Sequence, residues 1–338
     1  MLERRLFAVQ KIAVQKSDCV QTGVYHYQDT MKHFEARWEV AAGKEFVDHL
    51  ILMGHSGNGF EVTESPFGVT EDSRLDLRGF RMPGNPQLRR VTFRPTDFGA
   101  ASMKRVWLER CSFSDSSFIG ADFHGVKEHG SDFTNCLFTN CSFRAAAIGY
   151  RGSRFVKCVF DRVNFNRAIF VRPEFDDCVF DHCKLDGCDF NASSFEKSCF
   201  IGELYDVWFR GGFASPDDVA KHGRPRANQM VGVSFEKALL SDLTFSDGCE
   251  LASVKIPLDG RYLLVERWRD KLETLRERLS DLEDAEAKLI SLFVSTYSIH
   301  ARTQDWMILN RDDIEDTYGQ GVTNLIWQGL ASTPDTDP

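Results

Sequence analysis

The region from residue 91 to residue 202 carries a large apolar residue at almost every fifth position, with a small residue two places before it. One frame runs from Phe93 to Ile148, and a second frame, shifted by two residues, runs from Phe155 to Phe200. Most of the 28 Phe residues stand at these central positions, and Glu128 is the one polar interruption. A period of five fits neither the 3.6 of a helix nor the 2.0 of a strand, so the pattern predicts a solenoid.

Individual repeats have a recognisable composition: a small residue, a polar one, Leu or Phe, and two mostly polar residues. Cys136-Leu-Phe-Thr-Asn and Cys178-Val-Phe-Asp-His are examples, and this pattern resembles the pentapeptide repeat proteins. The resemblance implies a mainly β fold, a right-handed quadrilateral β-helix with one pentad on each side. Weaker pentads extend the expected β-helix to residues 75–258, with a break at about 211–232.

The flanking regions have other patterns. We expect a mixed, partly helical region over residues 1–74, which includes a helix from Thr30 to Ala42, and a helical region over residues 259–331 that begins with Asp259 as N-cap. Residues 332–338 have the composition of a disordered tail. Both flanking regions are candidate caps for the open ends of the solenoid, where sheet edges would otherwise be exposed.

The C-terminal region alternates apolar spacings of three and four, which predicts a long coiled-coil-like helix with one polar interruption at Glu286. Two arrangements remain open: the seam pairs with a second chain to form a homodimer, or it folds back on the chain's own terminal segment. The candidate oligomerisation residues are Val265, Trp268, Leu272, Leu275, Leu279, Leu282, Leu289 and Phe293.

Eight of the ten Cys residues occupy the small slot of a pentad, where Ala, Ser and Val also occur. A thiol there acts as a small buried filler. A spacing of five residues differs from that of zinc ligands, so we expect reduced cysteines, no metal and no cofactor.

Two features could suggest catalysis. The segment 50–59 resembles the strand and nucleophile turn of an α/β-hydrolase around Ser56, but Asn58 stands where that turn requires Gly. Glu128, near His124 and His129, could form a buried acid–base pair, although a loosened turn at Gly130 that swings Glu128 into solvent is the favoured interpretation. We therefore predict that the protein is not an enzyme, with a Ser56 hydrolase as a remote alternative.

Outward-facing residues of the repeat carry the functional signal. If four pentads form a coil and the frame shift is a bulge, one side presents an apolar strip at the second position of its pentads, while the next side is wetted by Ser102, Asp122 and Ser142. An exposed apolar strip is covered by the chain's own flanks or by a partner. The candidate partner-binding residues of the strip are Leu137, Val159 and Val179, widened by Ile119 and Ile201.

Charge separates the two halves of the repeat. Residues 75–172 carry 16 basic and 8 acidic side chains, whereas residues 173–210 carry 3 basic and 9 acidic ones. The acidic ring, with Asp176, Asp181 and Asp186 as candidate partner-binding residues, suits a DNA mimic that protects a type II topoisomerase. The basic half argues against mimicry along the whole rod. Direct nucleic-acid binding is also disfavoured, because basic residues are spread over several sides and aromatic residues point mostly inward.

The preferred interpretation is a non-enzymatic protein–protein interaction scaffold that oligomerises or docks through its C-terminal helix. A topoisomerase-protecting DNA mimic is the alternative. Residues 1–15 lack a signal-peptide pattern and no long apolar stretch occurs, so we expect a soluble, cytoplasmic protein without a membrane partner.

Overall fold

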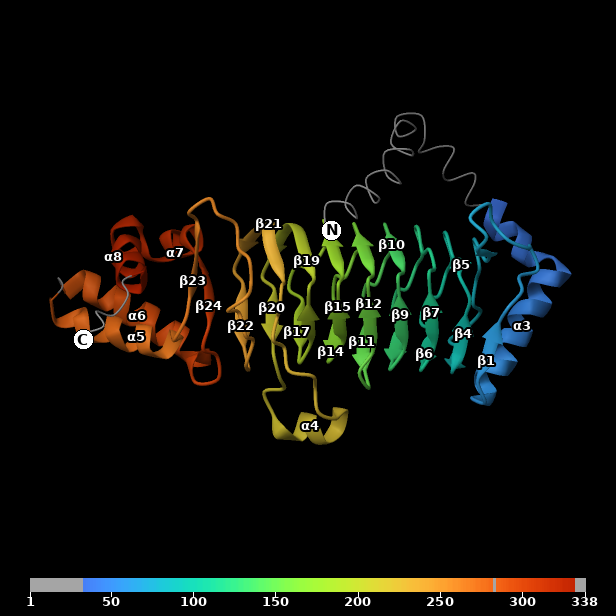
Figure 1. Cartoon of the computed structure of the whole chain (residues 1–338), viewed down its shortest axis with the longest axis horizontal. Helices are drawn as coiled ribbons and strands as arrows, with labels where there is room; N and C mark the ends of the chain where they lie inside the picture. Colours follow the sequence, from blue (N-terminus) through green and yellow to red (C-terminus); the bar gives the residue numbers. More distant parts are fainter. Residues whose placement is uncertain (1–32, 282–283, 332–338) are drawn as a thin grey trace, which may run out of the picture.

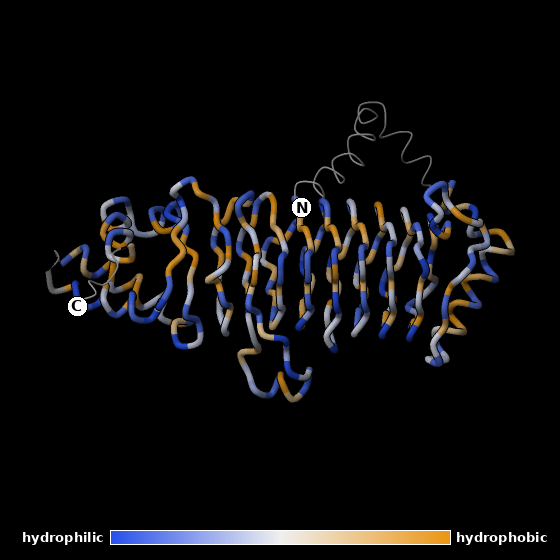
Figure 2. The backbone as a smooth tube through the Cα atoms, in the orientation of Figure 1, coloured by the Kyte–Doolittle hydropathy of each residue, from blue (hydrophilic) through white to orange (hydrophobic). Residues whose placement is uncertain are grey.

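The computed structural model describes residues 33–281 and 284–331. These residues form an elongated rod, with helix α3 covering one end and helices α5 to α8 covering the other (Figure 1). The body of the rod is a parallel β-solenoid with four sides. The predicted β-helix of pentads is therefore confirmed. In Figure 2, short apolar and polar stretches alternate along every coil of the solenoid.

The first side is a seven-stranded parallel sheet. Its strands are β1 (Phe60–Val62), β4 (Val91–Phe93), β7 (Ser112–Ser114), β9 (Asp132–Thr134), β12 (Arg154–Val156), β15 (Glu174–Asp176) and β18 (Ser194–Glu196). Pairing of β1 with β4 shows that this side begins ahead of the weaker pentads at residue 75.

The second side begins with the pair β2 (Leu75–Asp76) and β5 (Thr96–Asp97), and single bridges at Ser117 connect it to a five-stranded sheet. The strands of that sheet are β10 (Leu137–Thr139), β13 (Val159–Asp161), β16 (Val179–Asp181), β19 (Cys199–Tyr205) and β21 (Ser234–Ser241).

The third side has no regular strands, and isolated parallel bridges link its outward residues Arg81, Ser102, Asp122, Ser142, Asn164 and Lys184. The fourth side is an eight-stranded sheet. Its strands are β3 (Gln87–Arg89), β6 (Trp107–Glu109), β8 (Lys127–His129), β11 (Ala147–Tyr150), β14 (Ile169–Val171), β17 (Asp189–Asn191), β20 (Trp208–Arg210) and β22 (Thr244–Ser246).

The core consists of ladders of stacked rings. Phe118 and Phe138 lie 4.7 Å apart with an interplanar angle of 5°, and Phe180 and Phe200 lie 4.8 Å apart at 7°. The coil spacing of parallel strands imposes this stacking, because the same side chain recurs at the same place on each coil. The nine cysteines in the described part of the chain are free and buried, as expected of small core fillers.

The two-residue frame shift is a bulge, as predicted. Strand β11 pairs with β8 at Ala147↔Lys127 and at Tyr150↔His129, so the register shifts by one residue between the two pairs. Gly149 and Gly152 both have left-handed φ angles, of 94° and 80°, which allow the chain to accommodate the added residues.

The N-terminal cap contains the 3-10 helix η1 (Arg37–Glu39) and α3 (Ala41–Ser56). Trp38 packs edge-on against Phe67 and Phe80, which closes the first end of the core. The predicted helix from Thr30 to Ala42 is wrong in its extent: Val40 has extended backbone between η1 and α3, and Thr30 lies outside the described residues.

The C-terminal cap combines a two-stranded antiparallel sheet with four α-helices and a short 3-10 helix. Its elements are β23 (Tyr262–Val265), α5 (Trp268–Glu277), η2 (Arg278–Asp281), α6 (Asp284–Ala301), β24 (Met307–Asn310), α7 (Arg311–Tyr318) and α8 (Gln320–Ala331). The cap closes the last coil through side chains: Gln304 exchanges hydrogen bonds with the backbone of Cys249, and Asn310 donates to the carbonyl of Leu240.

The expected long coiled-coil-like helix is not continuous. The heptad seam is divided between α5 and α6, which pack against each other and against α8. Asp259 is not an N-cap, because Tyr262 to Val265 form a strand and α5 begins at Trp268; its carboxylate instead accepts from the backbone N–H of Arg261. Burial of Trp268, Leu272 and Leu275 between these helices stabilises the folded-back arrangement.

The expected break near 211–232 is an insertion in the first side. It leaves strand β20, forms helix α4 (Pro216–His222) and returns to β21, so it occupies the place of one first-side strand. Figure 1 shows α4 projecting from the flank of the rod. Asn228 accepts a hydrogen bond from the backbone N–H of Phe195, which satisfies the edge of β18.

Candidate interaction surface

The apolar strip predicted on the second side has the expected register. Bridges and strand pairs join Ser117 to Leu137, Leu137 to Val159, Val159 to Val179, and Val179 to Cys199. Leu137, Val159 and Val179 are half-buried, and Cys199 is buried. The strip is therefore continuous over three coils, with part of each side chain in solvent.

Ile119 and Ile201 border the strip at its two ends and do not widen it along its length. The side chains stacked between them in the same column are Thr139, Asp161 and Asp181. Burial raises the pKa of Asp161, which pairs with Arg162 at 2.7 Å. An apolar strip with a carboxylate border is thus the surface that the second side presents.

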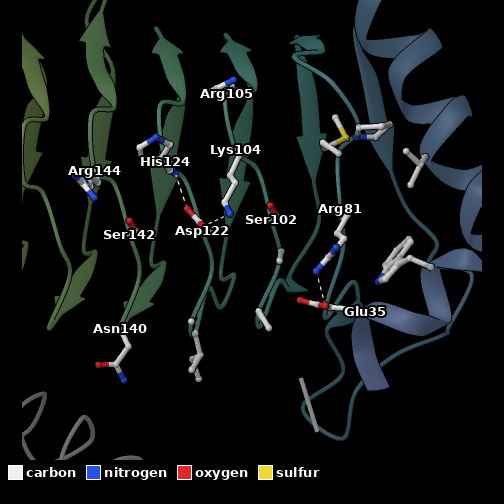
Figure 3. A pocket seen from close by; sticks show the side chains of 18 of the residues that line it. Glu35, Arg81, Ser102, Lys104, Arg105, Asp122, His124, Asn140, Ser142 and Arg144 are labelled. Carbon is white, nitrogen blue, oxygen red and sulfur yellow. Dashed lines mark hydrogen bonds and ion pairs between the residues drawn. The ribbon is translucent and has the colours of Figure 1, made fainter. Parts of the chain in front are cut away.

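A groove runs along the third side, beside the strip, and has a volume of about 2070 Å³. Its floor includes Ser102, Asp122 and Ser142, and the N-terminal cap contributes Glu35 to its wall (Figure 3). The groove reaches Ile119 and Leu137 at the border with the second side. The strip and the groove are thus adjacent parts of one surface.

Several of the charged side chains that line the groove form ion pairs. Lys104 contacts Asp122 at 3.0 Å, and the backbone N–H of His124 donates to the same carboxylate (Figure 3). Arg81 of the third side pairs with Glu35 of the N-terminal cap at 2.5 Å. Sequence reasoning recognised the wetted floor but missed the groove, because no pattern indicated which side the region before residue 60 would flank.

The predicted acidic ring is largely paired with cations. Arg226 from the insertion lies between Glu174, at 3.7 Å, and Glu196, at 2.5 Å. Asp181 contacts His182 at 2.5 Å, and Asp176 is half-buried. Asp186 is exposed. The insertion therefore places one cation, Arg226, on two carboxylates of this acidic region.

Asp189, in the same acidic region, is also paired with a cation. Its carboxylate accepts from Arg210 Nε at 3.0 Å. Burial is the largest influence on the pKa of Asp189 and raises it, while Arg210 opposes that change. This pair lies near the C-terminal end of the fourth side.

The candidate oligomerisation residues are mostly buried inside the chain. Val265, Trp268, Leu272, Leu275 and Phe293 are buried, Leu279 is half-buried, and Leu282 lies outside the described residues. Leu289 is 37% exposed and, with Leu292 at 54% and Ile299 at 71%, leaves an apolar face of α6 in solvent. Of the two arrangements considered, the structure shows the folded-back one within a single chain.

Ser56 is the last residue of α3, so the segment that resembles a strand and nucleophile turn is a helix. Its hydroxyl donates to the carbonyl of Met53 at 2.7 Å. Gly57 follows in the left-handed conformation typical of a helix C-cap. Ser56 therefore occupies the C-terminal end of a helix, with its hydroxyl bound to the helix backbone.

The predicted exposure of Glu128 is wrong. Glu128 is 2% exposed, and its carboxylate accepts from the backbone N–H groups of Ser131 at 2.8 Å and Gly149 at 2.9 Å. Burial raises the pKa of this carboxyl from its usual value to about 7, and its hydrogen bonds oppose the change. In the described part of the chain, no hydrogen bond or ion pair joins Glu128 to His124 or His129, so the suggested acid–base pair does not form.

Across the described ranges, no three His, Cys, Asp or Glu residues gather in a way that could hold a metal ion. None of the helices in residues 33–281 and 284–331 has the length and apolar character required to cross a membrane.

Comparisons with known proteins agree with the repeat pattern. The family model for pentapeptide repeats matches eight copies, in residues 88–127 and 174–202. No curated protein matches the sequence.

Solved structures include similar chains at low identity. HetL, a pentapeptide repeat protein involved in heterocyst differentiation regulation from the cyanobacterium Nostoc sp. strain PCC 7120, is 13% identical, covers 62% of this chain and 96% of HetL, and has a TM-score of 0.34. QnrB1, a plasmid-mediated fluoroquinolone resistance protein, is 13% identical over 59% of this chain and 89% of QnrB1, with a TM-score of 0.31.

Proposed function

We propose that this chain, which its repeats identify as a pentapeptide-repeat protein, is a non-enzymatic scaffold that binds another protein along the apolar strip and the adjoining groove. The proposal is carried by one observation: Leu137, Val159 and Val179 stack at successive coils on the outside of a rigid rod. Covering an apolar surface of this kind with a partner is favourable, because it removes apolar side chains from water. The paired charges of the groove supply a polar rim.

A second docking surface lies on the C-terminal cap. The exposed apolar face of α6, formed by Leu289, Leu292 and Ile299, is available to a partner or a second chain. The buried seam residues do not enter this proposal, since Trp268 and Leu272 already pack within the chain.

The test compares partner capture by the wild type with capture by Val159→Asp combined with Val179→Asp. The matched control is Ser112→Asp combined with Ser114→Asp, which adds the same charge to half-buried outward positions of the first side, away from the strip and the groove. Full-length proteins are incubated with native host extract, and the bound proteins are quantified by mass spectrometry. We expect the valine variant to lose, by about tenfold or more, a partner that the control retains.

Thermal unfolding of each variant checks that the rod remains folded. Equal capture by the wild type and the folded valine variant would contradict the assignment of the strip, and the absence of any specific partner would contradict the scaffold function.

The second candidate, protection of a type II topoisomerase by DNA mimicry, is motivated by the acidic coil and the projecting insertion. Supercoiling by gyrase, measured with and without a quinolone, tests it directly. The pairing of Arg226 with Glu174 and Glu196 reduces the negative surface that mimicry requires, so we expect no protection at micromolar protein. Protection there would replace the scaffold proposal for this part of the rod.

A further inference from the structure

One corner of the solenoid, between the fourth and first sides, carries a column of arginines. Arg90, Arg110, Arg151 and Arg172 all occupy this corner, and each has a left-handed φ, between 51° and 71°. Gly130 occupies the same corner on the coil between Arg110 and Arg151. A Cβ added to Gly130 would lie 3.5 Å from Arg151 Cβ and 3.9 Å from Arg110 Cγ. The column therefore has a gap at Gly130, lined by arginine side chains of the coils on either side.

A row of aromatic rings on the fourth side runs parallel to this column. Trp107 and His129 have ring centroids 5.2 Å apart, and His129 stacks on Tyr150 at 5.1 Å. The row continues onto the insertion, where His222 contacts Tyr150 at 5.4 Å and Phe213 contacts His222 at 5.7 Å. His129 and Tyr150 directly precede the corner positions 130 and 151. A ring thus stands directly beside the corner on two successive coils, and Trp107 lies on the coil before them, beside Lys127.

The charge around the corner is strongly positive. Lys127 Nζ lies 6.0 Å from the centre of the Trp107 ring, and Arg89 extends from the fourth side. Glu109 is the carboxylate within this group; it pairs with Arg151 at 2.8 Å and with Arg89 at 3.2 Å. Arg110 is exposed and makes no ion pair in the described part of the chain. Arg89 and Arg151 thus contact Glu109, and Arg90, Arg110, Lys127 and Arg172 add further positive charge along the corner.

Arg172 connects the column to the insertion. Its Nη1 donates to the carbonyl of Arg224 at 2.7 Å, which holds the insertion beside the corner. Its Nε is buried without a hydrogen-bond partner, as is Trp107 Nε1 near the other end of the aromatic row.

We propose that this corner, the aromatic–arginine corner defined by Arg90, Arg110, Arg151, Arg172, Trp107, His129 and Tyr150, binds single-stranded nucleic acid. Phosphates lie along the arginine column, and bases contact the aromatic row. This is the combination by which proteins bind single strands without reading sequence: a positive track and a parallel line of rings.

The aromatic row is the reason for choosing a single strand over other polyanions. An acidic peptide would use the arginines but has no aromatic bases to place on the rings. A duplex keeps its bases stacked inside and would leave the rings unused.

Two sequence-based arguments disfavoured nucleic acid, namely scattered basic residues and inward aromatic residues. At this corner the arginines are aligned, and the rings of Trp107, His129 and Tyr150 lie on the outside.

The test measures fluorescence anisotropy of labelled dT20 and U20 with the full-length protein at 50 mM NaCl and at higher salt. With about three or four phosphates neutralised, the slope of log K against log salt should be about −2 to −3. Arg110→Glu combined with Arg151→Glu should weaken binding by about tenfold or more. Tyr150→Leu should weaken it by about fivefold and leave the salt slope unchanged.

The matched control is Arg105→Glu combined with Arg144→Glu, which changes the charge equally at exposed arginines away from this corner. Arg110→Glu alone is the second variant, because Arg110 has no ion pair whose loss could disturb folding; thermal unfolding checks all proteins. A specific loss in the corner variants supports the proposal.

Any of four results overturns it: no binding of either oligonucleotide at 50 mM NaCl, equal loss in the control, equal affinity for a 20-base-pair duplex, or equal competition by polyglutamate. The valine variant of the apolar strip should bind the oligonucleotides normally, so the two proposals succeed or fail separately.

Discussion

Glu128 occupies a core position because the bulge one coil later leaves backbone donors that require an acceptor. Its two carboxylate oxygens accept from Ser131 and from Gly149, and Gly149 belongs to the bulge itself. A Phe at this position would fill the core but would leave both N–H groups buried and unpaired, at a cost of about 1–3 kcal/mol each. The interruption of the repeat and the shift of its frame are therefore one structural feature.

The raised pKa of Glu128 predicts a dependence of stability on pH. Between about pH 4.5 and pH 7 the folded protein keeps the Glu128 proton while the unfolded chain has lost it. The folded state thus binds more protons in that window, and its free energy of unfolding falls as the pH rises, by up to roughly 3 kcal/mol. Above pH 7 both states are ionised and this contribution no longer changes.

The measurement is urea unfolding at a series of pH values for the wild type and for Glu128→Gln. The variant should be less stable at pH 5, since its amide cannot accept both N–H groups, and should lack this part of the pH dependence. Asp132→Asn, at an exposed carboxylate nearby, is the control and should follow the wild type. An unchanged pH profile in Glu128→Gln would refute the assignment.

At the scale of elements, α5 and α6 show how a heptad seam can be satisfied within one chain. Leu275 is 3% exposed, and a Cβ added to Gly329 of α8 would lie 2.5 Å from Leu275 Cδ2. A side chain at position 329 would therefore force Leu275 to shift where α8 packs against α5. Within the chain, the seam residues pack α5 against α6 and against α8, so they are not free to pair with a second chain.

Leu275→Ala should therefore lower the free energy of unfolding by about 2–5 kcal/mol and leave the oligomeric state unchanged. Chemical unfolding and light scattering measure the two quantities. Leu292→Ala, at a 54% exposed position of α6, is the control for stability and should change it by less than about 0.5 kcal/mol. If Leu275→Ala dissociated an oligomer, the seam would have to pair between chains, contrary to this prediction.

At the scale of the whole molecule, the rod depends on closed ends. Each coil of a solenoid offers backbone donors and acceptors to the next, so the last coil needs a cap. The side-chain amide of Gln304 performs this task for Cys249: Nε2 donates to its carbonyl at 2.6 Å, and Oε1 accepts from its N–H at 2.9 Å. Tyr262 also contributes, by accepting from the N–H of Leu240 at 3.0 Å.

Gln304→Met keeps the size of the side chain but leaves both groups of Cys249 unpaired. We expect a loss of about 2–4 kcal/mol and faster hydrogen exchange in the last coils, measured by mass spectrometry. Gln320→Met, at an exposed position, is the matched control. Exchange that is unchanged around residue 249 would show that the cap closes the rod by other contacts.

The pentad register was predictable because it is local: each repeat places its own Phe inward, and stacking then follows from the coil. For the same reason the strip Leu137, Val159 and Val179 could be located from the sequence, together with its wetted neighbour. The position of Glu128 was predicted wrongly because one of the N–H groups that donate to its carboxylate belongs to Gly149, one coil away. Only the geometry of the bulge brings the two groups together.

The sequence by itself determined the solenoid, its core, its frame shift and the charge of its two halves, since these follow from side-chain size and polarity at a fixed period. Only the tertiary structure decided which distant groups meet. It folded the C-terminal seam on itself, placed Arg226 of the insertion on the acidic ring, and aligned Arg110 and Arg151 beside an outward row of rings. Such contacts depend on where insertions and caps return to the rod, and no repeat period encodes that path.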